Sequence, residues 1–515
     1  MIRTNAKQFA ESPAIVGEGR PVTYAELGER SDRIASGLVA AGLQVGDRVA
    51  YLARNATEYW ELFFAAAKAG VVIVPLNFRL SAEEISWILG DADPAAILVE
   101  DHLTSHVPAD WTGLKLAFAQ SSTGQHEVLV PFGWEALEEW VAAQDAVDPQ
   151  RDQTGDALAS MMYSSGTTGR PKGVTTTVGG FLWAVEAFGG LFGPTPDSVS
   201  LVPTPYYHIA AGGWSLIALA AGGRIVQFTE VTPQNMLGLM VGHRATHVIM
   251  VPTVMQLFIT SPEASQADYS SVQHVVYGGS PISETVMVGA QETFGAQLSQ
   301  SYGLTETVGV TTFLRPEDHV VGPDSKLRSA GRAVPGLEVA IFDPETGEEM
   351  PTGEVGEVVT RGPGVTKSYW RNPEATAAAF WPGGWFRTGD AGYMDAEGYV
   401  FLKDRIKDLL MSGGENIYPA EVENAIMAHP AVQEVAVIGV PSERWGETPL
   451  AVVVPKAGES IDGDELITFT RERLAHYKCP TAVEVIEQLP RNPSGKVLKR
   501  ELRAPHWAGH DRSIG

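Results

Sequence analysis

The sequence predicts an α/β protein with a large N-terminal domain, built from two doubly wound βαβ subdomains plus a small β-barrel, and a smaller α+β domain after it. Three features lead to this prediction. Short β-branched apolar segments alternate with helix-compatible segments in the first part of the chain, as in parallel sheets covered on both faces. From Val339 onward short alternating strands are separated by Gly, Pro and Asp, which is typical of antiparallel, barrel-like structure. After Asp408 a helix and two further strands follow.

The length of the chain also requires more than one hydrophobic core. A chain of 515 residues exceeds what one core usually serves, so about two to four structural units are expected. With 44% hydrophobic residues the chain can build these cores. We place the main boundary at Lys407, which gives an N-terminal domain of residues 1–406 and a C-terminal domain of residues 407–515.

Two capping boxes mark helix starts in the N-terminal part. The first, at residues 23–26, opens a helix that we expect to stop at Gly42. The second, at residues 81–84, lies between the apolar segments 71–74 and 97–99. This strand, helix, strand pattern predicts a βαβ unit.

The same pattern recurs further along the chain, and the later segments differ from it. Parallel strands are predicted at residues 225–228, 248–251 and 275–277. The antiparallel segment has strands at residues 339–342, 357–360 and 399–402, and the C-terminal region has a helix at 420–427 with strands at 435–438 and 451–454.

Composition excludes several classes of partner. The net charge of −25 argues against nucleic acid or an anionic membrane as the main partner, because the field of the protein would repel them. The single cysteine, Cys479, excludes an intrachain disulfide framework and suits a reducing compartment. The N-terminus has no signal-peptide pattern, and the best apolar run, Trp214–Ala221, is too short to span a bilayer. We expect a cytoplasmic protein without an integral membrane segment, and a homodimer is compatible with these features.

A loop rich in small and hydroxylated residues follows Tyr163. Its glycines allow consecutive backbone N–H groups to converge on an anion, while hydroxyls and a lysine add donors. The loop is not the usual P-loop, because the spacing from Gly166 to Lys172 is wrong and no Ser or Thr follows the lysine. The alternative is an ordinary surface loop. The candidate phosphate ligands are Ser164, Ser165, Gly166, Thr167, Thr168, Gly169 and Lys172.

Other chemistries lack their signatures. No Gly-x-Ser-x-Gly nucleophile elbow is present, which disfavours a serine hydrolase. His243 and His247 have a metal-like spacing, but no Glu follows the first histidine and the segment runs into a predicted strand. We therefore do not interpret this pair as a metal site.

The segment Ser301-Tyr302-Gly303-Leu304-Thr305-Glu306-Thr307 makes a family resemblance specific. Together with the loop after Tyr163 and motifs that continue to Lys496, it resembles the acyl-adenylate-forming superfamily of acyl-CoA synthetases, luciferases and peptide-synthetase adenylation domains. Five motifs occur in the family order, and the resemblance covers essentially the whole chain. Residues 403–421 are especially similar to bacterial fatty-acyl-CoA ligases.

The resemblance implies roles for the residues of the first two motifs. The loop would hold the β- and γ-phosphates of ATP, and Tyr302, next to Gly303, would stack on adenine. Thr305 would bind phosphate and Glu306 would bind Mg²⁺. Attack of a carboxylate on the α-phosphate needs such groups, because it brings two anions together. The alternative for Glu306 is a solvated acid at a helix start.

The later motifs are given roles in the same way. Asp390 would accept hydrogen bonds from the ribose hydroxyls, and Arg405 would add a cation nearby; the alternatives are an Asx turn and a surface ion pair. Lys496 would be the catalytic lysine of adenylation, with a mobile tail residue as its alternative. Lys407 occupies the hinge position of the family, so the C-terminal domain is expected to be mobile and to bring Lys496 in and out.

Further residues are expected along the acid and CoA passages. His208, after Tyr206-Tyr207, would gate the tunnel or hydrogen-bond the acid, although a lone histidine is more often structural. Trp445 would flank the pantetheine passage, with core packing as its alternative. Glycines and a serine are expected to let the ligands approach the backbone: Gly278, Gly279 and Ser280 for adenine and the acyl group, Gly413 and Gly414 for CoA.

The sequence thus predicts an ATP-dependent carboxylic acid:CoA ligase that uses ATP, Mg²⁺ and coenzyme A. The acid and ATP would give acyl-AMP and pyrophosphate, and the CoA thiol would then displace AMP. A medium or long fatty acid, or another apolar acid, is the expected substrate, in a pocket lined by residues 181–185, 208–214, 250–253 and 278–280. The alternatives are an enzyme that passes an aryl or other acid to a carrier protein, an amine or another nucleophile, and a catalytically silent nucleotide-binding homologue.

Overall fold

The computed structural model forms two compact units. It describes residues 1–120, 128–164, 171–229, 232–279, 282, 284–322, 325–412, 415–442, 444–491 and 497–508. Unit 1 comprises Met1–Val339 and Thr360–Phe386, and unit 2 comprises Ala340–Val359 and Arg387–Gly515. These units group residues by compactness, whereas the boundary at Lys407 concerns a hinge and stays a prediction.

Unit 1 contains a seven-stranded sheet in the order β7-β6-β5-β3-β4-β8-β9. All neighbouring strands are parallel except β8 and β9, which form an antiparallel pair. Its strands are β3 Arg48–Leu52, β4 Val72–Pro75, β5 Ala96–Glu100, β6 Leu114–Phe118, β7 Glu135–Ala136, β8 Leu158–Ser164 and β9 Lys172–Thr177. The helices of this part are α1 Ile2–Gln8, α2 Tyr24–Ala40, α3 Thr57–Ala69, α4 Ala82–Ala92 and α5 Leu137–Ala142.

A second sheet of unit 1 has nine strands in the order β16-β15-β14-β13-β12-β10-β11-β1-β2. The run from β14 to β1 is parallel, and β15, β16 and β2 are antiparallel additions. Its strands are β1 Pro13–Gly17, β2 Val22–Thr23, β10 Val199–Val202, β11 Arg224–Gln227, β12 His247–Met250, β13 His274–Gly278, β14 Gln297–Tyr302, β15 Thr312–Leu314 and β16 Arg332–Ala333. Its helices are α6 Val178–Phe192, α7 Ile209–Ala220, α8 Pro233–Gly242, α9 Pro252–Thr260, α10 Pro262–Ser265 and α11 Glu284–Phe294.

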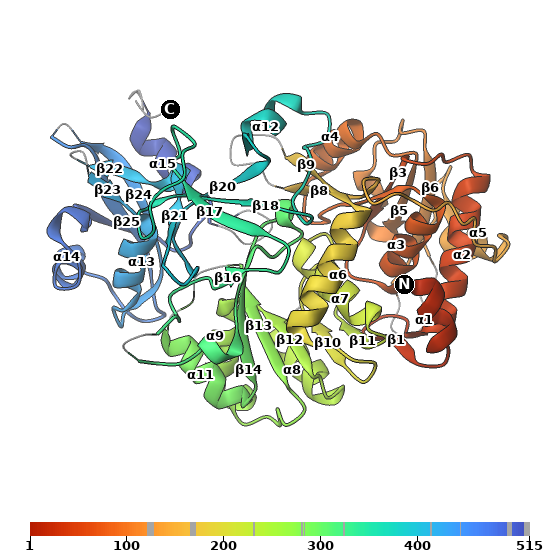
Figure 1. Cartoon of the computed structure of the whole chain (residues 1–515), viewed down its shortest axis with the longest axis horizontal. Coiled ribbons are helices and arrows are strands. Elements are labelled where there is room, and N and C mark those ends of the chain that lie inside the picture. The colour runs from red at the N-terminus through yellow and green to blue at the C-terminus, as the bar shows by residue number, and fades with distance from the viewer. Residues whose placement is uncertain are drawn as a thin grey trace. The chain divides into compact units, whose positions relative to one another are not determined.

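Helices α3, α6 and α7 provide much of the core that the two sheets share. One continuous core includes Tyr51 of β3, Trp60 of α3, Phe188 of α6, Trp214 of α7 and Ile225 of β11. Figure 1 shows α6 and α7, in yellow, between the strands of the first sheet and β10 and β11 of the second. The two predicted βαβ subdomains are therefore confirmed.

The predicted helix starts are also confirmed. The Thr23 N–H donates to the Glu26 carboxylate (2.7 Å), and the Thr23 hydroxyl accepts from the Glu26 N–H (3.3 Å). The Ser81–Glu84 box has the same arrangement at the start of α4. Such caps satisfy backbone donors that a helix leaves unpaired at its first turn.

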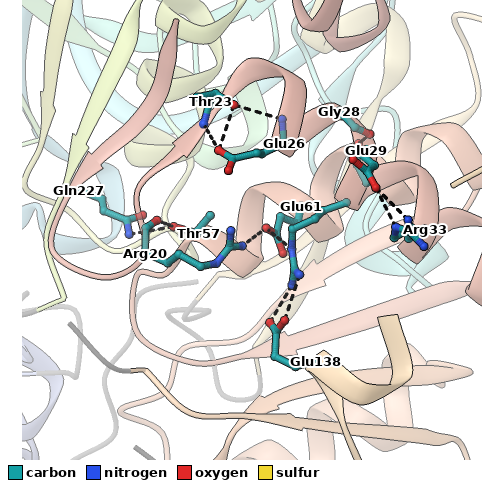
Figure 2. A network of polar contacts seen from close by, with 12 residues as sticks. Arg20, Thr23, Glu26, Gly28, Glu29, Arg33, Thr57, Glu61, Glu138 and Gln227 are labelled. Atoms are coloured by element: carbon teal, nitrogen blue, oxygen red, sulfur yellow. Dashed lines mark hydrogen bonds and ion pairs between the residues drawn. The ribbon is translucent and has the colours of Figure 1, made fainter. Parts of the chain in front are cut away.

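A buried carboxylate anchors α3 to its neighbours. Glu61 is fully buried and forms ion pairs with Arg20 and with Arg30, whose Nε lies 2.7 Å from Glu61 Oε1. Arg30 also contacts Glu138 of α5 at 2.8 Å (Figure 2). A buried charge is tolerated only with such partners, because burial removes its hydration.

The antiparallel segment predicted after Val339 is a five-stranded sheet in the order β17-β18-β20-β19, with β21 beside β20. Residues 390–394 of β20 pair antiparallel with residues 400–405 of β21. The elements are β17 Glu338–Phe342, β18 Gly356–Arg361, α12 Pro373–Ala378, β19 Phe380–Trp381, β20 Trp385–Met394 and β21 Val400–Arg405.

Unit 2 contains a sheet in the order β23-β22-β25-β24, with β26 beside β25. The predicted C-terminal helix and strands are confirmed as α13, β24 and β25. The elements are β22 Leu410–Ser412, β23 Glu415–Ile417, α13 Pro419–Met427, β24 Val432–Ser442, β25 Gly446–Pro455, α14 Gly463–Arg471, β26 Ala482–Val485 and α15 Lys499–Trp507. Within the described ranges, no helix combines the length and the apolar character that crossing a membrane would need.

Candidate active site

The glycine-rich loop connects two antiparallel strands. Tyr163 lies opposite Gly173, and Ser164 lies opposite Lys172, where β8 and β9 pair. The segment is therefore flanked by two paired antiparallel strands, and strand β9 rather than a helix N-terminus begins at Lys172, unlike in a P-loop. The other candidate ligands of this loop, Ser165, Gly166, Thr167, Thr168 and Gly169, lie outside the described residues.

Two predicted site residues, Lys172 and Glu306, both contact Tyr369. The Tyr369 hydroxyl donates to Glu306 Oε1 at 3.0 Å. The Lys172 ammonium nitrogen lies 5.0 Å from the centroid of the Tyr369 ring, which is within cation–π range. The structure thus brings the cation after the glycine-rich loop and the proposed metal carboxylate to one aromatic residue.

Tyr369 was missed by the sequence reasoning. It is 9% exposed, and burial together with the Glu306 carboxylate raises the pKa of its hydroxyl well above the usual value. The hydroxyl therefore stays protonated and can donate. The only signal in the sequence is the aromatic pair Tyr369-Trp370 after a glycine-rich turn, and such pairs more often pack in a core.

Glu306 lies on a tight turn after β14. Residues Thr305–Thr307 form a single 3-10 turn, and Val308 follows with a φ of +53°, a strained conformation for a buried β-branched residue. Before this turn, a Cβ on Gly303 would lie 2.4 Å from the Gly309 carbonyl oxygen. Gly303 is therefore required for the close approach that folds the turn back beside Tyr302.

The turn is also held by hydroxyl groups. Thr307 is fully buried, and its Oγ1 accepts from the Leu304 N–H at 3.0 Å. The Thr366 N–H donates to the Glu306 carbonyl at 2.7 Å. Thr305 and Glu306 are part-buried, so the side chains with proposed ligand roles keep access to solvent while the backbone between them is fixed.

Gly278 has a structural role that the sequence reasoning did not give it. A Cβ on Gly278 would lie 2.2 Å from the Ser301 carbonyl oxygen of the adjacent strand β14. Gly279 has a φ of +80°, and its Cβ position is 3.9 Å from Val251. Strand packing and backbone conformation alone therefore require these glycines, and their approach to adenine stays a prediction. Ser280 lies outside the described residues.

His208 lies at the end of a loop that is fixed by Asn55, which lies in the connection between β3 and α3. His208 is the N-cap residue of α7, with its ring 5.1 Å from that of Tyr207. Asn55 is 4% exposed, and its Nδ2 donates to the Thr204 carbonyl at 2.9 Å while the Tyr206 N–H donates to its Oδ1 at 2.8 Å. The sequence reasoning missed Asn55, because a single Asn after a strand resembles any turn residue.

Residues 209–214 of the segments expected to line an acyl pocket lie on α7. The Cβ position of Gly213 is 3.9 Å from the Val308 carbonyl oxygen, so this face of α7 lies beside the turn that carries Glu306. Trp214 is 5% exposed and donates from Nε1 to the Leu201 carbonyl at 3.1 Å. Trp214 is therefore fixed in the core, and its role as the floor of a pocket stays a prediction.

In unit 2, Asp390 and Arg405 form an ion pair. They lie directly opposite each other on β20 and β21, with Arg405 Nε 2.8 Å from Asp390 Oδ1. Arg405 also donates to the Thr388 carbonyl at 3.1 Å. Asp390 is 7% exposed, so the carboxylate is oriented by its partner rather than freely solvated. Its proposed contact with ribose stays a prediction.

The remaining candidates of unit 2 are described only in part. Lys407 lies in a 3-10 turn, Ile406–Asp408, directly after β21, but its side chain is outside the described residues. Trp445 is 45% exposed and stacks with Arg444, so the core-packing alternative is wrong. Gly413, Gly414 and Lys496 lie outside the described residues.

His247, the second histidine of the metal-like spacing, has a structural role. His247 is 3% exposed and shares hydrogen bonds with the Phe192 carbonyl (3.1 Å) and with Thr246 (2.8 Å). In the part of the chain that the structure describes, no group of three or more His, Cys, Asp or Glu residues could hold a metal ion.

A two-sheet α/β unit, a glycine-rich segment between two antiparallel strands, a carboxylate on the turn after β14 and an α+β unit are together typical of an adenylate-forming class of protein. The chain belongs to the AMP-binding enzyme family: that family matches residues 2–370, and the AMP-binding enzyme C-terminal domain matches residues 421–496.

Curated relatives and solved structures match the chain over almost its whole length. It is 38% identical over 515 residues to the fatty acid–[acyl-carrier-protein] ligase ScoC of Streptomyces coeruleorubidus. The aligned residues cover 99% of this chain and 96% of the relative. It is 40% identical over 501 residues to a feruloyl-CoA synthase of an Amycolatopsis species, covering 97% and 96%. The structure of ATP-bound MatB from Rhodopseudomonas palustris aligns with a TM-score of 0.86 and 33% identity, over 99% of this chain and 100% of that chain.

Proposed function

We propose that the protein is an AMP-forming carboxylic acid:CoA ligase. In the first step the acid attacks the α-phosphate of ATP, giving acyl-AMP and pyrophosphate, and in the second the CoA thiol displaces AMP. The observation that carries the proposal is the position of Lys172 and Glu306 at Tyr369, in a chain that matches the AMP-binding family in both its parts.

The residues of unit 1 supply charge for the first step. Negative charge grows on the triphosphate as the α-phosphate is attacked, and a positioned cation lowers the energy of that arrangement. Lys172 is proposed to contact the phosphates that leave as pyrophosphate. Tyr302 and Gly303 are proposed to contact adenine, and His208, at the start of α7, is proposed to contact the acid or gate its passage.

The proposal gives residues of unit 2 separate tasks. Asp390 is proposed to accept hydrogen bonds from the ribose hydroxyls, with Arg405 orienting its carboxylate. Lys496 is proposed to contact the attacking carboxylate and the α-phosphate, which suits a flexible side chain with a point charge. Rotation at Lys407 is proposed to exchange this lysine for the CoA passage formed by Gly413, Gly414 and Trp445.

Mg²⁺ fits the residues present. The Tyr369 hydroxyl donates to Glu306 Oε1, and no described residue bonds the second carboxylate oxygen. This oxygen is a ligand of the kind Mg²⁺ uses, since Mg²⁺ is often held by one or two carboxylates plus substrate phosphates. The ion would neutralise phosphate charge during adenylation. Glu306 is the residue that we propose to hold it.

The acid is proposed to have an apolar tail. Phe181, Ala184 and Trp214, from the segments expected to line the acyl pocket, are buried and uncharged. The matched relatives are named for a fatty acid and for ferulate, so fatty and aryl acids are both candidates. Within this class we propose a medium or long fatty acid, because the motifs after residue 403 resemble fatty-acyl ligases.

A second acceptor is supported by one relative. The 38% identical relative ScoC is named as a ligase to an acyl-carrier protein, so a carrier-bound phosphopantetheine thiol is the alternative to free CoA. The chemistry of the thiol is the same in both cases. Only the recognition of the rest of the acceptor differs.

A panel of acids tests this proposal. Fatty acids of several lengths and cinnamic-type acids would each be incubated with Mg·ATP, first with CoA and then with a holo-acyl-carrier protein. Mass spectrometry would measure AMP and the thioester product. AMP formation with acyl-CoA as product supports the proposal, AMP with thioester only on the carrier protein favours the alternative, and no AMP with any acid contradicts both.

A further inference from the structure

We propose that Tyr369 is a positioning residue that sets the Glu306 carboxylate and the Lys172 ammonium before ATP binds. The inference rests on the proposed function, because it takes Glu306 as the metal-binding carboxylate and Lys172 as a phosphate-binding cation. Tyr369 is assigned no role by the motifs in the sequence. It acts through two other side chains rather than on the reacting atoms.

The contacts use two different parts of the tyrosine. The hydroxyl donates to one oxygen of Glu306 (3.0 Å) and so leaves the other oxygen to face a cation. The ring face holds the Lys172 ammonium at 5.0 Å from its centroid. A single side chain therefore limits the rotation of both charged groups.

Hydrogen bonds to β9 and to Thr376 fix the backbone around Tyr369. Tyr369 forms a β-bridge with Val174 of β9, and the Trp370 N–H donates to the Gly173 carbonyl at 2.8 Å. The Tyr369 N–H donates to Thr376 Oγ1 at 3.0 Å. Tyr369 is thus attached to the strand that begins at Lys172.

A second set of bonds attaches the same segment to the turn that carries Glu306. The Thr366 N–H donates to the Glu306 carbonyl at 2.7 Å. The Thr366 hydroxyl also donates to the Thr175 carbonyl of β9 at 2.7 Å, and the Thr175 hydroxyl donates to the Ser368 carbonyl at 2.7 Å. The segment from Thr366 to Trp370 therefore connects β9, which begins at Lys172, to the turn that carries Glu306.

In its hydrogen bond with Glu306, the Tyr369 hydroxyl is the donor. A tyrosine hydroxyl is ordinarily neutral near pH 7 and a carboxylate only accepts, so the hydroxyl is the donor in this 3.0 Å contact. A neutral donor to a carboxylate orients it without cancelling its charge. The carboxylate therefore keeps its affinity for a divalent cation.

The test separates the two contacts with two variants. Tyr369→Phe removes the hydroxyl and keeps the ring over Lys172, whereas Tyr369→Leu removes both. Tyr393→Phe is the matched control, since Tyr393 also has a lysine, Lys403, over its ring at 5.3 Å but belongs to unit 2 and contacts neither Glu306 nor Lys172 in the described structure. Thermal unfolding of each variant checks that it is folded.

The readouts are calorimetric binding of ATP at a series of Mg²⁺ concentrations and ATP–pyrophosphate exchange. For Tyr369→Phe we expect the Mg²⁺ concentration at half-maximal ATP binding to rise by about 10- to 100-fold, as for loss of one hydrogen bond to a charged group, with ATP affinity at saturating Mg²⁺ changed by less than about 3-fold. Tyr369→Leu should in addition weaken ATP binding at saturating Mg²⁺. Tyr393→Phe should resemble the wild type.

An unchanged Mg²⁺ dependence in folded Tyr369→Phe would overturn the inference, and so would an equal shift in Tyr393→Phe. The phenylalanine variant carries the test if the leucine variant does not fold. Failure of the proposed function is seen separately, as a wild-type protein that binds Mg·ATP in the calorimeter but forms no AMP with any acid.

Discussion

Replacement of Asn55 by alanine tests how the loop that ends in His208 is held. The variant leaves the Thr204 carbonyl and the Tyr206 N–H, both bonded by the buried Asn55 side chain, without these partners. Each buried polar group left unpaired costs about 1–3 kcal/mol. We expect the free energy of unfolding to fall by about 2–4 kcal/mol, measured by chemical denaturation followed through tryptophan fluorescence.

The same change should impair catalysis. A displaced loop moves His208, and displacement of a positioning group by about 1 Å can cost up to about 100-fold in rate. We expect kcat/KM for the acid in ATP–pyrophosphate exchange to fall by about 10- to 100-fold, measured at a temperature where the variant is fully folded.

Asn5→Ala is the matched control. Asn5 is 6% exposed and its Nδ2 donates to the carbonyls of Leu219 (2.8 Å) and Ala220 (3.2 Å) at the opposite end of α7. It should lose a similar stability and keep its exchange activity. Equal activity in the two variants, whether both are impaired or both are normal, would refute the reasoning that Asn55 positions the loop.

Three further predictions concern the turn, a half-buried carboxyl group and a buried histidine. Gly303→Ala should lower exchange activity by at least about 10-fold with no rescue by Mg²⁺, because a Cβ would lie 2.4 Å from the Gly309 carbonyl oxygen, and wild-type kinetics would contradict this. Partial burial and the nearby Glu61 carboxylate raise the pKa of Glu58 from 4.5 to about 7. The folded state therefore binds more protons in this window, and stability falls as pH rises through it. Glu58→Gln should remove this slope and add about 3 kcal/mol at pH 8, measured by denaturation, against no change if Glu58 is solvated. Burial and the neighbouring His247 lower the pKa of His274 from 6.5 to about 4. Between these pH values the folded state binds fewer protons than the unfolded state, so the free energy of unfolding falls as pH drops through this window. His274→Gln should reduce this loss of stability by up to about 3 kcal/mol, and an unchanged slope of stability against pH would count against the prediction.

The regular elements could be predicted because their signals are local. The reciprocal bonds of Thr23 with Glu26 need only residues three positions apart, and the apolar runs at β4 and β11 are buried because the sheets have helices on both faces. Charged candidates could be named from motif order, and the pairing of Asp390 with Arg405 then followed from two strands that place them opposite each other.

The residues that position the site could not be predicted, because their partners are distant in the sequence. Tyr369 contacts Glu306 and Lys172, which precede it by 63 and by almost 200 positions, and no local pattern distinguishes it from a core aromatic. Asn55 bonds backbone groups about 150 residues away. The steric need for Gly278 was likewise hidden, since it depends on the strand that packs beside it.

The central claim is that the protein adenylates a carboxylic acid with Lys496 as the lysine of that step. The most direct measurement is acid-dependent ATP–pyrophosphate exchange by the wild type and by Lys496→Ala, with the acid chosen from the panel. We expect exchange by the wild type and a fall of roughly two or more orders of magnitude in the variant, as for loss of one transition-state donor. Exchange at the wild-type rate in Lys496→Ala would contradict the account.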